Sequence, residues 1–200
     1  YGLVGSEMCI RDRTTAIPVL CVFDNEEIGS ETKQGAASAF LPETLTAITT
    51  ALGLTSGDYR RLVANSFLLS CDNGHARHPN HPELADANEA PVLNGGVVVK
   101  HSPRYATDAV SAAAFQEICR RAQVPTQHYA NRPDQAGGAT LGNIANTKLP
   151  VNTVDIGMAQ LAMHSCFETM GSRDVAHFVR AVTACYEAAL TFTDTQVTLG

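Results

Sequence analysis

Residues 17–30 read IPVLCVFDNEEIGS, a short apolar run followed by two adjacent carboxylates, Glu26 and Glu27, and then a glycine. The run is rich in valine, isoleucine and leucine, so it predicts a buried strand. In α/β folds, ligand-binding and catalytic groups gather where strands end at their carboxyl edge. Neighbouring residues there point in different directions, which allows one carboxylate to hold a metal while the other handles a proton. The alternative for the pair alone is a solvated acidic turn.

The composition favours one globular domain with an ordinary core. The 200 residues are 44% hydrophobic and 17% charged, with a formal net charge of −6. The sequence has no basic run, so nucleic acid is not an expected partner, and no apolar segment is long enough to suggest a membrane span. Six cysteines without a CxxC pair are typical of free thiols in a cytoplasmic protein.

The first residues differ from the rest of the chain. Residues 1–13, YGLVGSEMCIRDR, have no clear period and lack the basic start, long apolar centre and cleavage site of a secretory signal. We interpret residues 1–13 as a non-native leader and residues 14–200 as the folded part. Because the sequence does not begin with Met, we expect a fragment of a longer protein.

Strand and helix patterns alternate along residues 14–200 and predict an α/β fold in which helices sandwich a sheet. Strands are expected at 17–23, 66–71, 97–100, 127–130 and 151–156. Helices are expected at 42–52, 58–64, 107–122, 140–148 and 174–190.

Two further candidate sites follow later strands. Asp72 ends the strand at 66–71, where its carboxylate can reach a cation, although a turn aspartate that bonds its own backbone is the common alternative. His75 and His78 come next, with His81 at a spacing that matches no structural zinc pattern, so we expect one or two of them to support Asp72. His164 follows the strand at 151–156. A lone histidine of this kind is usually a core residue, but a neutral imidazole is the expected partner of carboxylates around zinc.

A glycine-rich stretch, GGATLGN at residues 137–143, lies between these candidate sites. It is neither a Walker loop nor a dinucleotide fingerprint, because Asn143 stands where the Walker lysine is needed. Gly137 and Gly138 either let the backbone approach a substrate closely or form a tight turn into a helix.

Taken together, these stretches resemble the M18 family of metallo-aminopeptidases, the aspartyl aminopeptidase group. The matching pieces are residues 24–30, the stretch from Asp72 to HPN at 78–80, Lys100 with RYA at 104–106, residues 137–142, and residues 154–165 ending in AMHS. Their order and spacing fit across nearly all of residues 14–190. The resemblance implies an α/β catalytic domain of the zinc-exopeptidase type, incomplete at its N-terminus.

The resemblance also implies the metal chemistry. Glu26 corresponds to the general base that takes a proton from the zinc-bound water, Glu27 and His164 to ligands of one zinc, and Asp72 to a ligand of the other. Two Zn²⁺ per complete site are implied, with Co²⁺ or Mn²⁺ as alternatives that ligand types alone do not separate.

The substrate side is implied less directly. Lys100 corresponds to a position that faces the substrate, where a cation favours acidic side chains, while the alternative is a surface lysine lying along a strand. Gly137, Gly138 and Thr140 belong to the loop that shapes the substrate pocket.

The implied activity is the hydrolysis of N-terminal residues, acidic or neutral, from peptides by a cytoplasmic homo-oligomer. The family also uses a histidine and a metal-bridging aspartate upstream of its Glu-Glu motif, and neither is visible here, so we expect little activity from this chain alone. The alternatives are a non-catalytic homologue that packs into an oligomer and a dinuclear zinc deacylase. The peptidase hypothesis predicts that Glu26, Glu27, Asp72 and His164 converge on one cleft.

Overall fold

The computed structural model describes residues 16–135, 137–193 and 196–200, so the predicted leader at 1–13 lies outside the described residues. The centre is a mixed sheet with strand order β1-β5-β3-β4. Strands β1 and β5 are parallel, as are β3 and β4, whereas β3 and β5 are antiparallel. The sequence predicted all four strands to within one residue at each end: Phe67–Cys71 (β1), Val97–His101 (β3), Thr126–Ala130 (β4) and Asn152–Gly157 (β5).

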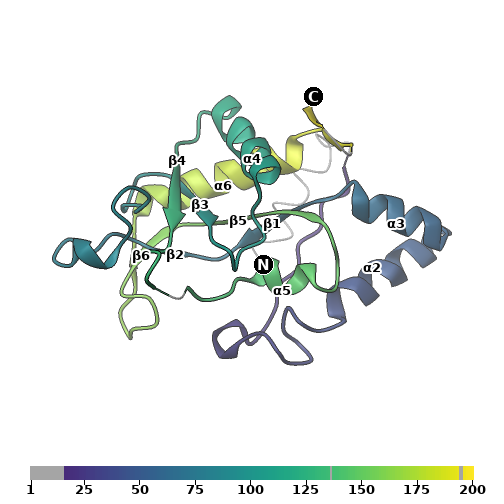
Figure 1. Ribbon diagram of the computed structural model, residues 1–200. Helices are drawn as coiled ribbons and strands as arrows, with labels where there is room; N and C mark the ends of the chain where they lie inside the picture. The colour runs from purple at the N-terminus through teal and green to yellow at the C-terminus, as the bar shows by residue number, and fades with distance from the viewer. Residues whose placement is uncertain (1–15, 136, 194–195) are drawn as a thin grey trace.

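Helices cover both faces of this sheet, which confirms the predicted α/β fold (Figure 1). On one face lie α4 (Ala109–Arg121) and α6 (Ser172–Glu187), and on the other lies α5 (Leu141–Asn146). The two remaining described α-helices, α2 (Phe40–Ala51) and α3 (Ser56–Ala64), pack together near β1. Asp108 caps the start of helix α4, because its carboxylate accepts the Ser111 backbone N–H at 2.7 Å.

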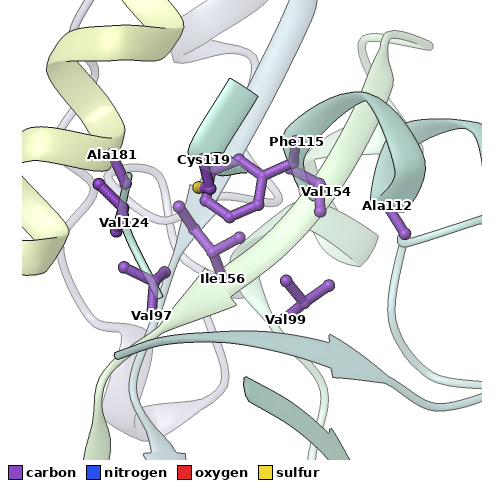
Figure 2. Close-up of a cluster of buried hydrophobic side chains, with 9 residues drawn as sticks. All are labelled: Val97, Val99, Ala112, Phe115, Cys119, Val124, Val154, Ile156 and Ala181. Carbon is purple, nitrogen blue, oxygen red and sulfur yellow. The ribbon is translucent and has the colours of Figure 1, made fainter. Parts of the chain in front are cut away.

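The main core lies between the sheet and α4 with α6 (Figure 2). Because strand side chains alternate between the two faces, every second residue of β3 and β5 enters this core. Phe115 of α4 is fully buried at its centre. The cluster comprises Val97, Val99, Ala112, Phe115, Cys119, Val124, Val154, Ile156 and Ala181. The opposite face of the same strands carries polar side chains, among them the buried Lys100 and Asp155, and it is this face that bears the candidate site.

A second, smaller core joins α2 and α3 to the sheet. Leu41, Val63, Leu149 and Val151 form its buried part, and Phe23 and Cys21 pack against it from the N-terminal segment. Helix α3 starts with a capping box between Thr55 and Asp58, which satisfies backbone groups at its first turn.

The strand predicted at 17–23 is wrong. The structure gives this segment no regular secondary structure, and Ile17, Val19, Leu20 and Val22 are 46–73% exposed. A strand needs a ladder partner for its backbone groups, and among the described residues none pairs with this segment. Cys21 and Phe23 of this segment pack against the second core, and the Tyr186 hydroxyl donates a hydrogen bond to the Val19 carbonyl at 3.0 Å.

Short elements that the sequence did not predict complete the fold. Gly74–His75 (β2), Ala159–Leu161 (β6) and Thr169–Met170 (β7) form a small sheet, and Leu190–Phe192 (β8) pairs with Val197–Leu199 (β9). Glu26–Ile28 (η1) and Pro82–Leu84 (η2) are single 3₁₀ turns. In the part of the chain that the structure describes, no helix combines the length and apolarity that crossing a membrane requires.

Candidate active site

The two adjacent carboxylates lie on a tight 3₁₀ turn, η1. Asn25 before the turn has φ 61° and Gly29 after it has φ 98°, so left-handed backbone brackets the pair. The Gly29 N–H bonds the Glu26 carbonyl at 2.9 Å, and the Asn25 side chain donates to the Thr32 hydroxyl at 3.0 Å. A non-glycine residue in this region is strained, and such strain clusters at functional sites, so Asn25 favours the functional interpretation of this turn.

His164 lies on the loop between β6 and β7 and also has left-handed backbone, with φ 65°. Its backbone N–H donates to Glu168 Oε1 at 2.7 Å, which fixes the loop from within. Its Nε2 lies 2.9 Å from Glu27 Oε2, and both side chains are mainly exposed, at 64% and 71%. The structure thus brings together the two residues predicted as ligands of one zinc, although 136 positions separate them in the sequence.

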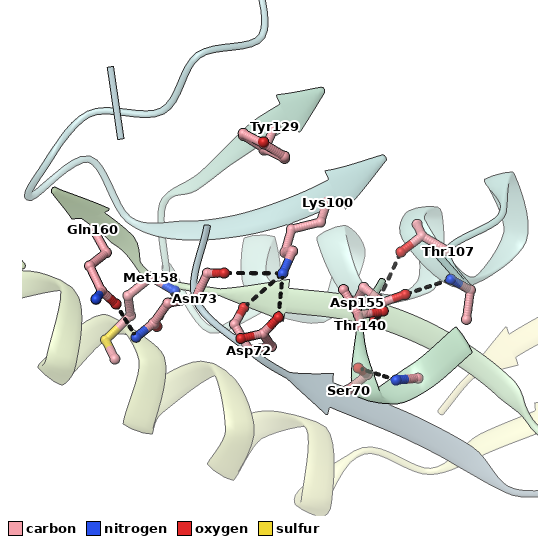
Figure 3. Close-up of polar contacts among 12 residues, drawn as sticks. Ser70, Asp72, Asn73, Lys100, Thr107, Tyr129, Thr140, Asp155, Met158 and Gln160 are labelled. Atoms are coloured by element: carbon pink, nitrogen blue, oxygen red, sulfur yellow. Dashed lines mark hydrogen bonds and ion pairs between the residues drawn. The ribbon is translucent and has the colours of Figure 1, made fainter. Parts of the chain in front are cut away.

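Asp72 follows β1 on the polar side of the sheet (Figure 3). Its backbone N–H bonds the Ile156 carbonyl at 2.9 Å, which extends the β1–β5 ladder by one residue. Its Oδ2 forms an ion pair with Lys100 Nζ at 3.0 Å. Lys100 is 2% exposed and also donates to the Asp72 and Asn73 carbonyls, at 3.2 and 3.1 Å.

Glu26 is the group whose ionisation the site affects most clearly. Partial burial raises the pKa of Glu26 above its usual value, and the negative charges of Asp72 and Glu27 raise it further, while Lys100 and His164 act in the opposite direction. The effect of a charge weakens with distance, so Asp72, Glu27 and His164 lie near Glu26. The four predicted residues therefore lie in one neighbourhood.

His75 belongs to the same neighbourhood. Burial lowers the pKa of His75, the positive charges of His164 and Lys100 lower it further, and Asp72 opposes them. His78, by contrast, accepts the Asn80 backbone N–H at 3.2 Å, and its ring lies 5.3 Å from that of His81. These contacts of His78 are local to its own exposed loop.

The residues in place fit part of a zinc site. A carboxylate oxygen and an imidazole nitrogen 2.9 Å apart can both reach one ion at the roughly 2.0–2.2 Å typical of zinc. However, no group of three or more His, Cys, Asp or Glu side chains suited to a metal occurs among the described residues. Asp72 forms an ion pair with Lys100, so Glu27 and His164 are the two predicted ligands that lie against one another.

The residues predicted to bind substrate differ in accessibility. Gly138 has open space where a Cβ would lie, whereas a Cβ on Gly137 would meet the Asn131 amide. Thr140 is 1% exposed and its hydroxyl donates to a buried carboxylate. The Lys100 ammonium has three hydrogens and three bonded oxygens, so binding a substrate requires it to release one of them.

An open hollow of about 560 Å³ lies beside the candidate site. It is lined by residues 31–33 and Ala37 of the loop that follows η1, and by Asn143, Ile144, Thr147 and Lys148 around α5. None of the predicted site residues lines it.

Sequence reasoning missed three polar residues that build the polar face of the sheet. Asn73 donates to Gln160 Oε1 at 2.7 Å and accepts the Met158 N–H at 3.2 Å, which ties the chain after β1 to β6 (Figure 3). Asp155 is fully buried within β5. A charged residue inside the apolar run 151–156 was the available signal, since a buried carboxylate must have hydrogen-bond partners.

The α/β fold, the paired carboxylates and the facing histidine together are typical of metal-dependent hydrolases. Comparison with known proteins narrows this class: the family described as "Aminopeptidase I zinc metalloprotease (M18)" matches residues 2–186. The chain belongs to the M18 family of zinc aminopeptidases, as its resemblance to that family implied.

Individual relatives agree with this assignment. A probable M18 family aminopeptidase 2 from Mycobacterium bovis is 44% identical over 87% of this chain and 41% of its own length. Among solved structures, prApe1 is 34% identical with a TM-score of 0.79, over 82% of this chain and 35% of its own. The mApe1 dodecamer from yeast is 30% identical with a TM-score of 0.76, over 91% and 42%. The chain spans about two fifths of the length of the curated relative.

Proposed function

We propose that this chain supplies one part of the catalytic centre of a zinc-dependent aminopeptidase. Glu26 is the general base, Glu27 and His164 are ligands of one zinc, and Asp72 is a ligand of a second ion. The observation that carries the proposal is the 2.9 Å contact between Glu27 and His164, beside a Glu26 carboxyl whose pKa is raised.

The raised pKa of Glu26 suits its role. A general base works best when its pKa lies nearer the working pH than that of an ordinary carboxylate, because proton uptake from the attacking water is then less uphill. The negative charges of Asp72 and Glu27 help by favouring the protonated form of Glu26. After the peptide bond breaks, the same carboxyl group can give its proton to the leaving amine.

Zinc, when bound, supplies Lewis acidity to the attacking water and the scissile carbonyl. Glu27 and His164 would hold a carboxylate oxygen and an imidazole nitrogen at one point for it, with Glu26 adjacent in sequence to Glu27. The exposure of both donors leaves room for a substrate and for further ligands. Those ligands, a histidine and a bridging aspartate, come from the part of the family's length that this chain does not span.

Specificity and assembly follow from the same family. We propose cleavage at the N-terminal residue, with a preference for acidic side chains if Lys100 turns toward the substrate. The yeast mApe1 structure is a dodecamer, which supports a homo-oligomer for the whole protein. We also propose a cytoplasmic location, two ions per complete site, and little activity from this chain alone.

A zinc-dependent peptidase assay tests the function. Aminoacyl anilides with acidic or neutral residues are supplied to this chain and to a protein that spans the family's full length, with N-acyl amino acids in parallel. We expect zinc-dependent anilide cleavage from the longer protein and little from this chain. In the longer protein, Glu26→Gln should lower kcat by about 10²–10⁴-fold while its zinc content is unchanged. His78→Gln serves as the matched control.

The other outcomes identify the alternatives. Cleavage of N-acyl amino acids without anilide cleavage would indicate a dinuclear deacylase. A longer protein that binds no zinc would indicate a non-catalytic homologue that assembles through its fold. Strong zinc-dependent activity from this chain by itself would refute the proposal that it holds only part of the centre.

A further inference from the structure

A fully buried carboxylate, Asp155, lies in the middle of β5 on the polar face of the sheet. Its neighbours along the strand, Val154 and Ile156, point into the main core on the other face. None of the chemistry proposed above uses this carboxylate. Desolvating a carboxylate is costly unless hydrogen bonds replace the lost water, so its partners indicate what it holds in place.

The partners of Asp155 come from two separate loops (Figure 3). Its Oδ2 accepts the Ala106 backbone N–H at 2.6 Å, and its own backbone N–H donates to the Thr107 hydroxyl at 2.8 Å. Its Oδ1 accepts the Thr140 hydroxyl, also at 2.6 Å. One carboxylate thus joins the loop that follows β3 to the glycine-rich loop that precedes α5.

The start of α5 shows that the Thr140 contact replaces an ordinary cap. A threonine at the N-cap position usually accepts a backbone N–H from the first turn of its helix. Thr140 occupies that position without making such a bond, because its hydroxyl is directed to Asp155. The Gly142 N–H is satisfied instead by Ser70 Oγ on β1, at 2.8 Å, and Ser70 is the register partner of Asp155.

Each loop carries, or lies beside, residues predicted to serve the substrate side. The first carries Tyr105, whose ring centroid lies 5.1 Å from Lys100 Nζ. The second carries Gly137 and Gly138. We propose that Asp155 is a positioning residue that holds these two loops in register with Lys100 and so shapes the substrate side of the centre. That these loops face a substrate rests on the proposed function. The anchoring of the two loops by Asp155 involves neither zinc nor turnover.

Amide-resolved hydrogen exchange by NMR on the full chain tests the anchoring. Asp155→Ala removes both acceptors, so we expect exchange at Ala106 and Gly142 to accelerate at least tenfold while the amides of α3 keep their wild-type rates. Asp155→Asn should stay close to wild type, because its amide can accept from Ala106 and donate to the Thr140 oxygen. Thr140→Val should accelerate exchange at Gly142 but leave Ala106 unchanged.

A second readout separates positioning from general support of the fold. The Lys100 side-chain resonances carry a ring-current shift from Tyr105, and they are readily assigned because the chain has three lysines. Asp155→Ala should reduce this shift toward the value in a Tyr105→Leu reference, whereas Asp155→Asn should retain it.

Some results would overturn the inference. Wild-type exchange at Ala106 and Gly142 in Asp155→Ala, or acceleration spread equally over α3, would show that Asp155 does not act on these loops. If Asp155→Ala does not fold, Thr107→Val and Thr140→Val replace it, each expected to loosen only its own loop. No change in either variant would refute the proposal. If the wild-type whole protein shows no peptidase activity while these exchange results hold, the proposed function alone is refuted.

Discussion

The close approach of α5 to the sheet makes Gly142→Ala a sharp test of how the candidate site is built. An alanine Cβ at this position would lie 2.7 Å from Ser70 Cβ, 2.8 Å from Asp155 Oδ1 and 2.8 Å from Ser70 Oγ. Contacts under 3 Å force a shift, and all three atoms belong to short side chains on the edge strand β1 and its neighbour β5. The first turn of α5 must therefore move away from β1 and β5.

The expected loss of stability combines three contributions. Overpacking a close contact costs about 1–3 kcal/mol. Weakening the 2.8 Å bond from the Gly142 N–H to Ser70 Oγ adds about 1 kcal/mol. Because residue 142 lies within α5, the better helix propensity of alanine returns about 0.5–1 kcal/mol. The net destabilisation is about 1–3 kcal/mol.

Urea unfolding followed by circular dichroism measures this loss. With an m-value of about 2 kcal/mol/M, the midpoint should fall by about 0.5–1.5 M. The matched control is Gly138→Ala, whose Cβ meets nothing within 4 Å and which should change stability by less than about 0.5 kcal/mol. Adding Ser70→Gly to Gly142→Ala should recover part of the loss. Equal stability of the two single variants would refute the reasoning.

Three further predictions concern single side chains. Glu26→Gln should be more stable than the wild type at pH 7. Because the pKa of Glu26 is raised in the folded state, the wild type loses stability as the pH rises from the unfolded pKa through the folded one, so the stability difference should vanish near pH 4. A variant less stable than the wild type at pH 7 would contradict this. Asp174→Ala leaves two backbone N–H groups before β3 without their acceptor, so the free energy of unfolding in urea should fall by about 2–6 kcal/mol. Asp174→Asn should lose less stability, and equal losses in the two variants would count against this hydrogen-bonding role. Phe115→Ala removes a buried ring and should lower stability by about 3–5 kcal/mol, whereas the exposed Val110→Ala should lower it by less than about 0.5 kcal/mol. Similar thermal midpoints for the two variants would show that Phe115 is not at the centre of the core.

Much of the fold could be predicted from local pattern. The strands at 67–71 and 97–101 begin with short apolar runs, FLL and VVV, and the strands at 126–130 and 152–157 were predicted although they carry several polar residues. The run at 17–23 has the same composition but a different outcome, because a strand also needs a partner and the described residues provide none. An apolar composition favours burial, whereas strand pairing depends on residues elsewhere in the chain.

The candidate site could be predicted only in part. Glu27 and His164 were identified by their resemblance to a family motif, and the structure brings them into contact. The ion pair of Lys100 with Asp72 could not be predicted, because it depends on the register of β3 beside β5 and on the turn after β1. The role of Asp155 was equally hidden, since its partners come from two loops that lie far apart in sequence.

The central claim is that Glu27 and His164 hold one zinc ion beside Glu26, and a zinc titration by calorimetry tests it most directly. The account predicts that the wild-type chain binds zinc and that Glu27→Ala and His164→Ala each weaken the affinity at least tenfold. The exposed His78→Ala should leave the affinity unchanged, since the His78 ring contacts Asn80 and His81 of its own loop. Zinc binding that is absent from the wild type, or equally strong in all four proteins, would contradict the claim.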